Sequence, residues 1–205
     1  MTIRTVIFDI GGVLEITPRT GWDQRWESLL QVKPGELRGR LRDVFRGGSI
    51  GTLSEAEVEE HIGTIMEITP IEVNAFMADL WVEYLGELNV DLTAYFASLR
   101  PRYQTGILSN SFVGARHKEQ KRYGFDDLCD CIIYSHEEGM QKPDPRFYAL
   151  ACTRFGVQPG EVLFLDDTEE CVTAARACGI RAILFTETNQ AIADIQAVLE
   201  HRGQQ

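Results

Sequence analysis

Residues 5–12 read TVIFDIGG, which is four residues of an apolar run, then Asp9, and then a turn with a glycine pair. An apolar run of this length is typical of a strand that is buried on both faces of a parallel sheet. Similar runs recur at 106–108, 132–134, 162–165 and 182–185. Helix-like stretches occupy residues 114–123, 145–155, 169–178 and 190–201. Because runs and helices alternate, the sequence predicts an α/β fold with a doubly wound parallel sheet.

The stretch from about residue 17 to residue 100 breaks this alternation. It contains no convincing strand, and its apolar residues recur at helical spacing, which predicts helices over 22–31, 35–45, 54–66, 71–85 and 92–99. Ser54 and Glu57 form a capping-box pattern, and Gly47-Gly48 with Gly51 predict a flexible break. We therefore predict a helical cap at 17–100, inserted into an α/β core made of residues 1–16 and 101–205.

Bulk composition excludes several classes of protein. The 205 residues, 44% of them apolar, suffice for one core and a small inserted module. A net charge of -11, without a run of Lys or Arg, argues against a nucleic-acid partner. No stretch is long enough to span a bilayer, and the amino terminus lacks a signal-peptide pattern. Five cysteines without zinc-type spacing fit free thiols, so we expect a cytoplasmic protein; its oligomeric state is not predicted.

Polar residues follow the apolar runs where a parallel sheet binds its ligands, at the carboxyl ends of the strands. Each has an ordinary explanation as a turn, a loop, a solvated lysine or a helix cap. Two adjacent aspartates after a buried strand are nevertheless costly without a positive partner, and oxygen ligands suit a hard divalent cation. Their fixed order at successive strand ends favours one shared site. The candidates are Asp9, Ser109, Asn110, Lys142, Asp166 and Asp167.

With these residues the sequence resembles the haloacid dehalogenase (HAD) superfamily. The resemblance covers about residues 1–15 and 101–201, and the helical insert lies where this family places its first type of cap. Within the family, the segment 134–143 is most similar to bacterial glucose-1-phosphate phosphatases and to the phosphatase domain of soluble epoxide hydrolases. The four motifs of the family match Asp9, Ser109-Asn110, Lys142-Pro143 and Asp166-Asp167.

The resemblance implies a magnesium-dependent phosphohydrolase that acts on a small phosphate monoester, with sugar phosphates among the candidates. Asp9 would be the nucleophile and would form an aspartyl-phosphate, with Lys142 as a second catalytic residue. Mg²⁺ would be held by Asp9, the Gly11 carbonyl and Asp167, with Asp166 close by; which aspartate binds directly is left open. The phosphoryl oxygens would be held by Ser109, Asn110 and Lys142.

Position 11 departs from the family pattern. Phosphatases of this family carry a second aspartate two residues after the nucleophile, where this chain has Gly11. A general acid-base contributes about 10²–10⁴-fold, so its loss predicts a slow enzyme, another proton donor, or a substrate such as an anomeric phosphate, whose oxygen leaves more readily. Glu15, His136 and Glu137 are substitute donors to consider, although each is expected to be a solvated loop residue.

Two other functions compete with this prediction. A 2-haloacid dehalogenase uses the same aspartate nucleophile without a metal, but the Asp166-Asp167 pair would repel its carboxylate substrate. A non-catalytic binding or regulatory protein is the second alternative, because Gly11 removes the usual acid-base group. The cap is expected to select the substrate. Its aromatic residues are expected to pack its helices, with sugar stacking as the lesser alternative; they are Trp22, Trp26, Phe76, Trp81 and Tyr84.

Overall fold

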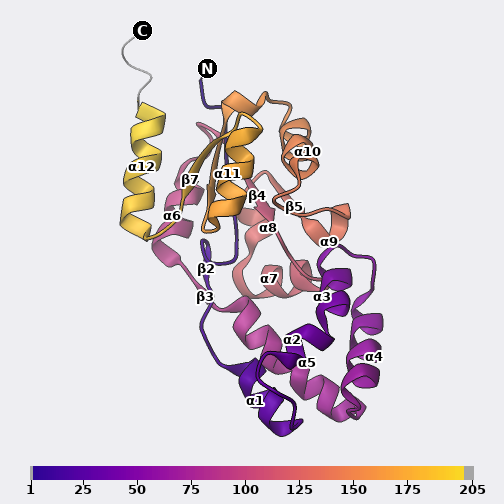
Figure 1. Cartoon of the computed structure of the whole chain (residues 1–205). Helices are drawn as coiled ribbons and strands as arrows, with labels where there is room; N and C mark the ends of the chain where they lie inside the picture. Colours follow the sequence, from indigo (N-terminus) through magenta and orange to yellow (C-terminus); the bar gives the residue numbers. More distant parts are fainter. Residues whose placement is uncertain (1, 201–205) are drawn as a thin grey trace.

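The computed structural model describes residues 2–200 and is built around a five-stranded parallel sheet (Figure 1). The strands are β1 (Thr5–Phe8), β4 (Gln104–Ser109), β5 (Cys131–Tyr134), β6 (Val162–Asp166) and β7 (Arg181–Leu184). Their order is β5-β4-β1-β6-β7, and every pairing in this sheet is parallel. Phe8 at the end of β1 pairs with Ile107 on one side and Leu165 on the other, so the carboxyl ends of the three central strands lie together.

Helices cover both faces of the sheet, which confirms the predicted doubly wound α/β fold. Val6 and Phe8 of β1 pack in a cluster with Phe96 and Ile195, whereas Ile7 packs on the opposite face. The sequence-predicted end of the last helix at residue 201 lies outside the described residues. The helices of this part of the chain are α6 (Val90–Ser98), α7 (Ala115–Tyr123), α8 (Phe125–Leu128), α9 (Ser135–Glu138), α10 (Pro145–Phe155), the 3-10 helix η1 (Pro159–Glu161), α11 (Glu169–Ala177) and α12 (Thr188–Glu200).

Five further helices form a cap at one end of the sheet (Figure 1). They are α1 (Trp22–Leu29), α2 (Glu36–Arg40), α3 (Arg42–Ser49), α4 (Glu55–Met66) and α5 (Pro70–Leu85). The expected capping box begins α4, where Ser54 and Glu57 satisfy each other's backbone N–H groups. Aromatic side chains fill the cap, and the rings of Trp22 and Phe76 meet edge to face at 5.1 Å between centroids. The cap therefore has an apolar core of its own.

Two sequence predictions in the cap are wrong. The helix expected over 35–45 is divided into α2 and α3, and α3 continues through Gly47 and Gly48, where a flexible break was expected. A Cβ atom on Gly48 would lie 2.4 Å from the Phe112 ring. Glycine at position 48 thus allows α3 to approach the core closely, and the helix continues through it.

A two-stranded antiparallel ribbon joins the cap to the core. It pairs β2 (Glu15–Ile16) with β3 (Glu87–Leu88), and the second strand lies in the stretch where no strand was expected. Strands of two residues are too short to show an alternating pattern in the sequence. The Asn89 side chain donates a hydrogen bond to the Val13 carbonyl at 3.0 Å and so ties the ribbon to the core.

The exact boundary of the cap remains a prediction. α6 lies within the predicted span 17–100, yet its Leu92 and Phe96 side chains belong to the apolar cluster of the sheet. Phe96 stacks on Phe8 of β1 with 4.6 Å between ring centroids. We therefore propose that the cap unit ends before α6.

All five cysteines are free thiols, and Cys129, Cys152 and Cys171 are buried. Within residues 2–200, none of the helices has the length and apolar character needed to cross a membrane.

Candidate active site

A buried lysine connects the ends of two neighbouring strands. Asp9 follows β1, Asp166 ends β6, and Lys142 comes from the loop after α9. The Lys142 Nζ atom lies 2.8 Å from Asp9 Oδ2 and 2.7 Å from Asp166 Oδ2. Only 2% of Lys142 is exposed, and Asp166 is fully buried. Charges removed from water this completely are tolerated only when each is paired and hydrogen-bonded, as these are.

The ionisation of Asp9 and of Lys142 depends on this pairing. Burial raises the pKa of Asp9 to about 7, although Lys142 pulls it in the opposite direction. Burial also works to lower the pKa of Lys142, but the carboxylates of Asp9 and Asp166 outweigh it and hold this pKa above its ordinary value. Lys142 therefore carries a positive charge at neutral pH. Further positive charge beside Asp9 would favour its ionised form.

Three carboxylates at this edge of the sheet fit a divalent cation. Asp9, Asp166 and Asp167 each offer one oxygen, and these atoms lie within 4.8 Å of one another. Asp166 is fully buried, and each of its oxygens accepts one hydrogen bond, one from Lys142 and the other from the Thr168 backbone N–H at 2.8 Å. Asp167 is exposed, and its Oδ1 accepts only a 3.2 Å hydrogen bond from the Thr168 hydroxyl. An all-oxygen set suits Mg²⁺, and Asp167 has more freedom than Asp166 to bind it.

The glycine after Gly11 makes room for Asp167. Gly12 has a φ of +73°, and a Cβ atom on it would lie 2.1 Å from Asp167 Oδ2. Any side chain there would displace the carboxylate from the cluster. Gly11 itself lies at the same turn, and the expected role of its carbonyl as a cation ligand remains a prediction.

The predicted phosphate-binding residues lie beside this cluster. Ser109 is buried at the end of β4, next to β1 in the sheet, and Asn110 follows it. The Asn110 side chain makes two hydrogen bonds with the backbone of Lys142: Nδ2 donates to the carbonyl at 2.9 Å, and Oδ1 accepts from the N–H at 2.8 Å. Asn110 thus fixes the loop that carries Lys142. The structure brings all six predicted side chains to one edge of the sheet.

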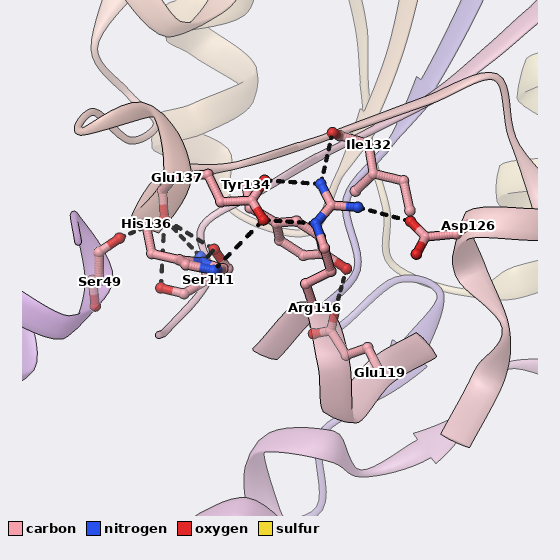
Figure 2. Close-up of polar contacts among 10 residues, drawn as sticks. Ser49, Ser111, Arg116, Glu119, Asp126, Ile132, Tyr134, His136 and Glu137 are labelled. Atoms are coloured by element: carbon pink, nitrogen blue, oxygen red, sulfur yellow. Dashed lines mark hydrogen bonds and ion pairs between the residues drawn. The ribbon is translucent and has the colours of Figure 1, made fainter. Parts of the chain in front are cut away.

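A hydrogen-bond network behind this loop was not predicted (Figure 2). The Ser111 hydroxyl lies 2.6 Å from His136 Nδ1, and the Ser111 N–H donates to the Ser135 hydroxyl at 2.8 Å. That hydroxyl donates to the Ser49 carbonyl of α3 at 2.7 Å. The network ties the loop after β4 to the cap. The sequence named His136 only as a substitute donor, and the spacing of Ser49, Ser111 and Ser135 gave no signal that they would meet.

A second polar group lies on the other side of Tyr134 (Figure 2). Arg116 pairs with Glu137 at 2.6 Å and with Asp126 at 2.7 Å, and its guanidinium lies over the Tyr134 ring. The Tyr134 hydroxyl donates to Glu119, which is 2% exposed. Burial raises the pKa of Glu119 to about 7. This group joins α7 to β5, and of the residues named from the sequence it includes only the substitute donor Glu137.

Glu15 is not the solvated loop residue that the sequence predicts. It begins β2, only 2% of it is exposed, and its Oε1 atom has no hydrogen-bond partner among the described residues. Its Oε2 accepts from the Thr17 hydroxyl at 3.3 Å. Burial raises the pKa of Glu15 to about 8. In the sequence, the only indication that Glu15 is buried was its position directly after the apolar pair Val13-Leu14. Of the other two substitute donors, His136 is partly buried and Glu137 is exposed but paired with Arg116.

A cavity of about 330 Å³ separates the cap from the core beside this site. Asn110 and Ser111 line it from the core, and Thr17 lines it from the start of the cap. The facing wall includes Trp22 and Tyr84 of the cap. A small molecule in this cavity would therefore contact the cap and the predicted phosphate-binding loop together.

Known proteins resemble this chain in fold and in sequence. A structure of a HAD family enzyme from Bacteroides thetaiotaomicron, in complex with magnesium and inorganic phosphate, superposes with a TM-score of 0.76 at 22% identity, covering 90% of this chain and 94% of that one. "Phosphatase MT3486" of Mycobacterium tuberculosis is 32% identical over 197 residues, which are 93% of this chain and 90% of that protein. D-ribitol-5-phosphate phosphatase of Bacteroides thetaiotaomicron is 24% identical over 190 residues, with coverage of 86% and 89%.

The chain spans well under half of some longer relatives. It covers 39% of pig bifunctional epoxide hydrolase 2, to which it is 26% identical over 218 residues. Residues 3–179 match the family model of haloacid dehalogenase-like hydrolases. The family resemblance predicted from the four motifs is thus confirmed, and the chain belongs to the haloacid dehalogenase-like hydrolases.

Proposed function

We propose that this hydrolase is a magnesium-dependent phosphatase that cleaves a small phosphate monoester with Asp9 as its nucleophile. The observation that carries the proposal is the placement of Lys142 between Asp9 and Asp166, with Asp167 completing a cluster of carboxylate oxygens. Such a cluster matches the needs of a reaction that transfers a highly charged group. Two relatives named as phosphatases, and a similar fold that binds magnesium and phosphate, support it.

Each residue has a distinct part in the proposed reaction. An Asp9 oxygen attacks phosphorus in line with the leaving oxygen and forms an aspartyl-phosphate, which water then hydrolyses. The positive Lys142, with Ser109 and Asn110, holds the phosphoryl oxygens and stabilises the charge that spreads over them. Asn110 has an additional part through its two hydrogen bonds to the Lys142 backbone, which orient the lysine.

The cation would be held by Asp9, the Gly11 carbonyl and Asp167, with Asp166 behind them. Mg²⁺ in such a site supplies positive charge that offsets the charge of the phosphoryl group. Asp166 acts through Lys142, whose Nζ atom donates to it at 2.7 Å in a fully buried pair.

The cavity indicates the size of the substrate. About 330 Å³ between cap and core is room for a small leaving group, and a sugar phosphate or sugar-alcohol phosphate fits this description. The Bacteroides relative named for D-ribitol 5-phosphate supports the same class. Five free thiols agree with a reducing compartment, so we place the enzyme in the cytoplasm.

Phosphate release by the purified protein tests this proposal. We expect turnover of 4-nitrophenyl phosphate and of several sugar phosphates with Mg²⁺, and its loss when EDTA removes the ion. Asp9→Asn should abolish turnover while the thermal melting curve stays cooperative. Asp43→Asn is the matched control, because Asp43 is exposed on α3 and should leave turnover unchanged.

Other outcomes would identify the competing functions. Turnover that survives Asp9→Asn would remove Asp9 as the nucleophile. Release of halide from a 2-haloacid without Mg²⁺, and no release of phosphate, would indicate a dehalogenase. An absence of any turnover, with phosphate binding retained, would indicate a binding protein.

A further inference from the structure

Cleavage of an ordinary phosphate ester leaves an alkoxide, which is a poor leaving group unless it receives a proton as the bond to phosphorus breaks. The carboxylates nearest to the proposed reaction have other parts. Asp9 is the proposed nucleophile, and both oxygens of Asp166 are bound by Lys142 and Thr168. Asp167 is the freer member of the cation cluster. Fast cleavage of an alkyl phosphate would therefore need a proton donor other than these three carboxylates.

Glu15 is the carboxyl group whose position suits this task. Gly11 and Glu15 form an isolated bridge between their backbones, which places the Glu15 side chain beside the turn that follows Asp9. The Glu15 Oε2 atom lies 3.9 Å from the point that a Cβ atom on Gly11 would occupy. Among the described residues, no other atom outside the immediate neighbours comes within 4 Å of that point. The Glu15 side chain thus extends from β2 into the space beside Gly11.

The surroundings of Glu15 form a built site. Gly86 makes room for it, because a Cβ atom there would lie 1.7 Å from Glu15 Oε1. That buried oxygen has no hydrogen-bond partner in residues 2–200, which is costly for a carboxyl group with only a structural role. The other oxygen accepts from Thr17, and Thr17 lines the cavity next to Asn110 and Ser111. The Glu15 carboxyl group thus lies beside the nucleophile turn, and Thr17 connects it to the cavity.

We propose that Glu15 is the general acid-base of this enzyme. It would replace, from β2, the carboxylate that position 11 lacks because Gly11 has no side chain. The inference rests on the proposed phosphatase function. As Asp9 bonds to phosphorus and the phosphorus bond to the leaving oxygen breaks, the Glu15 carboxyl gives its proton to that oxygen. An alcohol departs and Glu15 is left as a carboxylate. It then takes a proton from water as the water oxygen bonds to phosphorus and the bond from Asp9 breaks, which releases phosphate and restores the acid.

Leaving-group dependence of the near-isosteric variant Glu15→Gln tests the proposal. The substrates are 4-nitrophenyl phosphate, whose phenolate leaves without a proton, and two alkyl phosphates, glycerol 3-phosphate and D-ribitol 5-phosphate. The measured quantity is kcat/KM with saturating Mg²⁺, which reports the steps up to the first bond cleavage. We expect kcat/KM to fall by about 10²–10⁴-fold on the alkyl phosphates and by less than about 3-fold on 4-nitrophenyl phosphate.

Two further variants separate proton transfer from a structural effect. Glu87→Gln, on the exposed strand β3 of the same ribbon, is the matched control and should leave both values unchanged. Adding Gly11→Asp to Glu15→Gln should restore at least part of the alkyl phosphate activity, since a carboxylate would return to the same space. An equal loss of kcat/KM on both kinds of substrate, or no rescue in a double variant that folds, would overturn the inference.

The outcome also distinguishes this inference from the proposed function. If the wild-type protein cleaves 4-nitrophenyl phosphate through Asp9 but neither alkyl phosphate, the phosphatase proposal stands and the role of Glu15 fails. If the wild-type protein releases phosphate from none of the three substrates, both proposals fail together.

Discussion

The carboxyl edge of the sheet and the cap keep their positions by opposite means. At the sheet edge, buried charges are held by direct pairing, and Lys142 lies within 2.8 Å of two carboxylates. In the cap, apolar side chains pack against one another, and α3 comes close to the core because Gly48 has no side chain, with the hydrogen bond from Ser135 to Ser49 beside it. Loss of one partner leaves a buried charge unpaired, whereas a close-packed apolar contact is disturbed by added volume.

Among the substitutions that compare these two regions, removal of Lys142 should lower the free energy of unfolding the most. Lys142→Met leaves Asp9 and Asp166 buried without a positive partner, and we expect it to lower the free energy of unfolding by about 3–5 kcal/mol near neutral pH. Urea unfolding without Mg²⁺ measures this loss. Lys118→Met is the control, because its pair with Glu55 is partly exposed and should contribute less than about 1 kcal/mol. Equal losses in the two variants would contradict the role given to the buried pair.

The two adjacent aspartates should differ in a second measurement. We expect Asp167→Asn to raise the Mg²⁺ concentration for half-maximal phosphate release by at least about 10-fold, because this carboxylate is the freer ligand. Asp166→Asn should change the Mg²⁺ requirement less and lower the melting temperature more, since it removes a partner of Lys142. Mg²⁺ titrations of activity and thermal melting of both variants decide between them. The reverse ranking would identify Asp166 as the direct ligand.

A pair of glycine substitutions probes the cap. Gly48→Ala would bring a methyl group into the Phe112 ring, and we expect a loss of about 1–3 kcal/mol from the forced separation of α3 and the core. Gly39→Ala in α2 meets no atom within 4 Å and should instead stabilise the protein by about 0.4–1 kcal/mol. Denaturant unfolding of the two variants measures whether the free energy of unfolding falls in Gly48→Ala and rises in Gly39→Ala. A stabilised Gly48→Ala would mean that α3 is not held closely against Phe112.

The smallest expected effect concerns pH. The folded-state pKa of Glu119, about 7, lies above its usual value of 4.5, so the folded protein binds this proton more tightly than the unfolded chain does. The resulting stabilisation is complete below pH 4.5 and is lost as pH rises through about 7. Glu119→Gln keeps an acceptor for the Tyr134 hydroxyl and should remove about 1 kcal/mol of the change in stability between pH 5 and pH 6. Denaturant unfolding of both proteins at pH 5 and pH 6 measures this change. If stability varied with pH equally in Glu119→Gln and in the wild-type protein, the role given to Glu119 would be wrong.

The core was predictable because each strand is long and apolar enough to show in the sequence. The runs at 5–8 and 162–165 coincide with β1 and with most of β6. The ribbon of β2 and β3 was not predictable, since two residues have no period. The glycines of α3 were misjudged for a related reason. A glycine can mark a break or a close contact, and the partner that decides between them, Phe112, is distant in the sequence.

The sequence by itself determined the parallel core, the family and the polar residues at the strand ends, because local hydrophobic pattern and short motifs carry that information. Only the tertiary structure decided which carboxylates are paired with Lys142, that Asp167 is exposed, and that Glu15 is buried beside Gly11. These properties depend on distances between separate segments and on exclusion of water. Both arise only when the chain is packed.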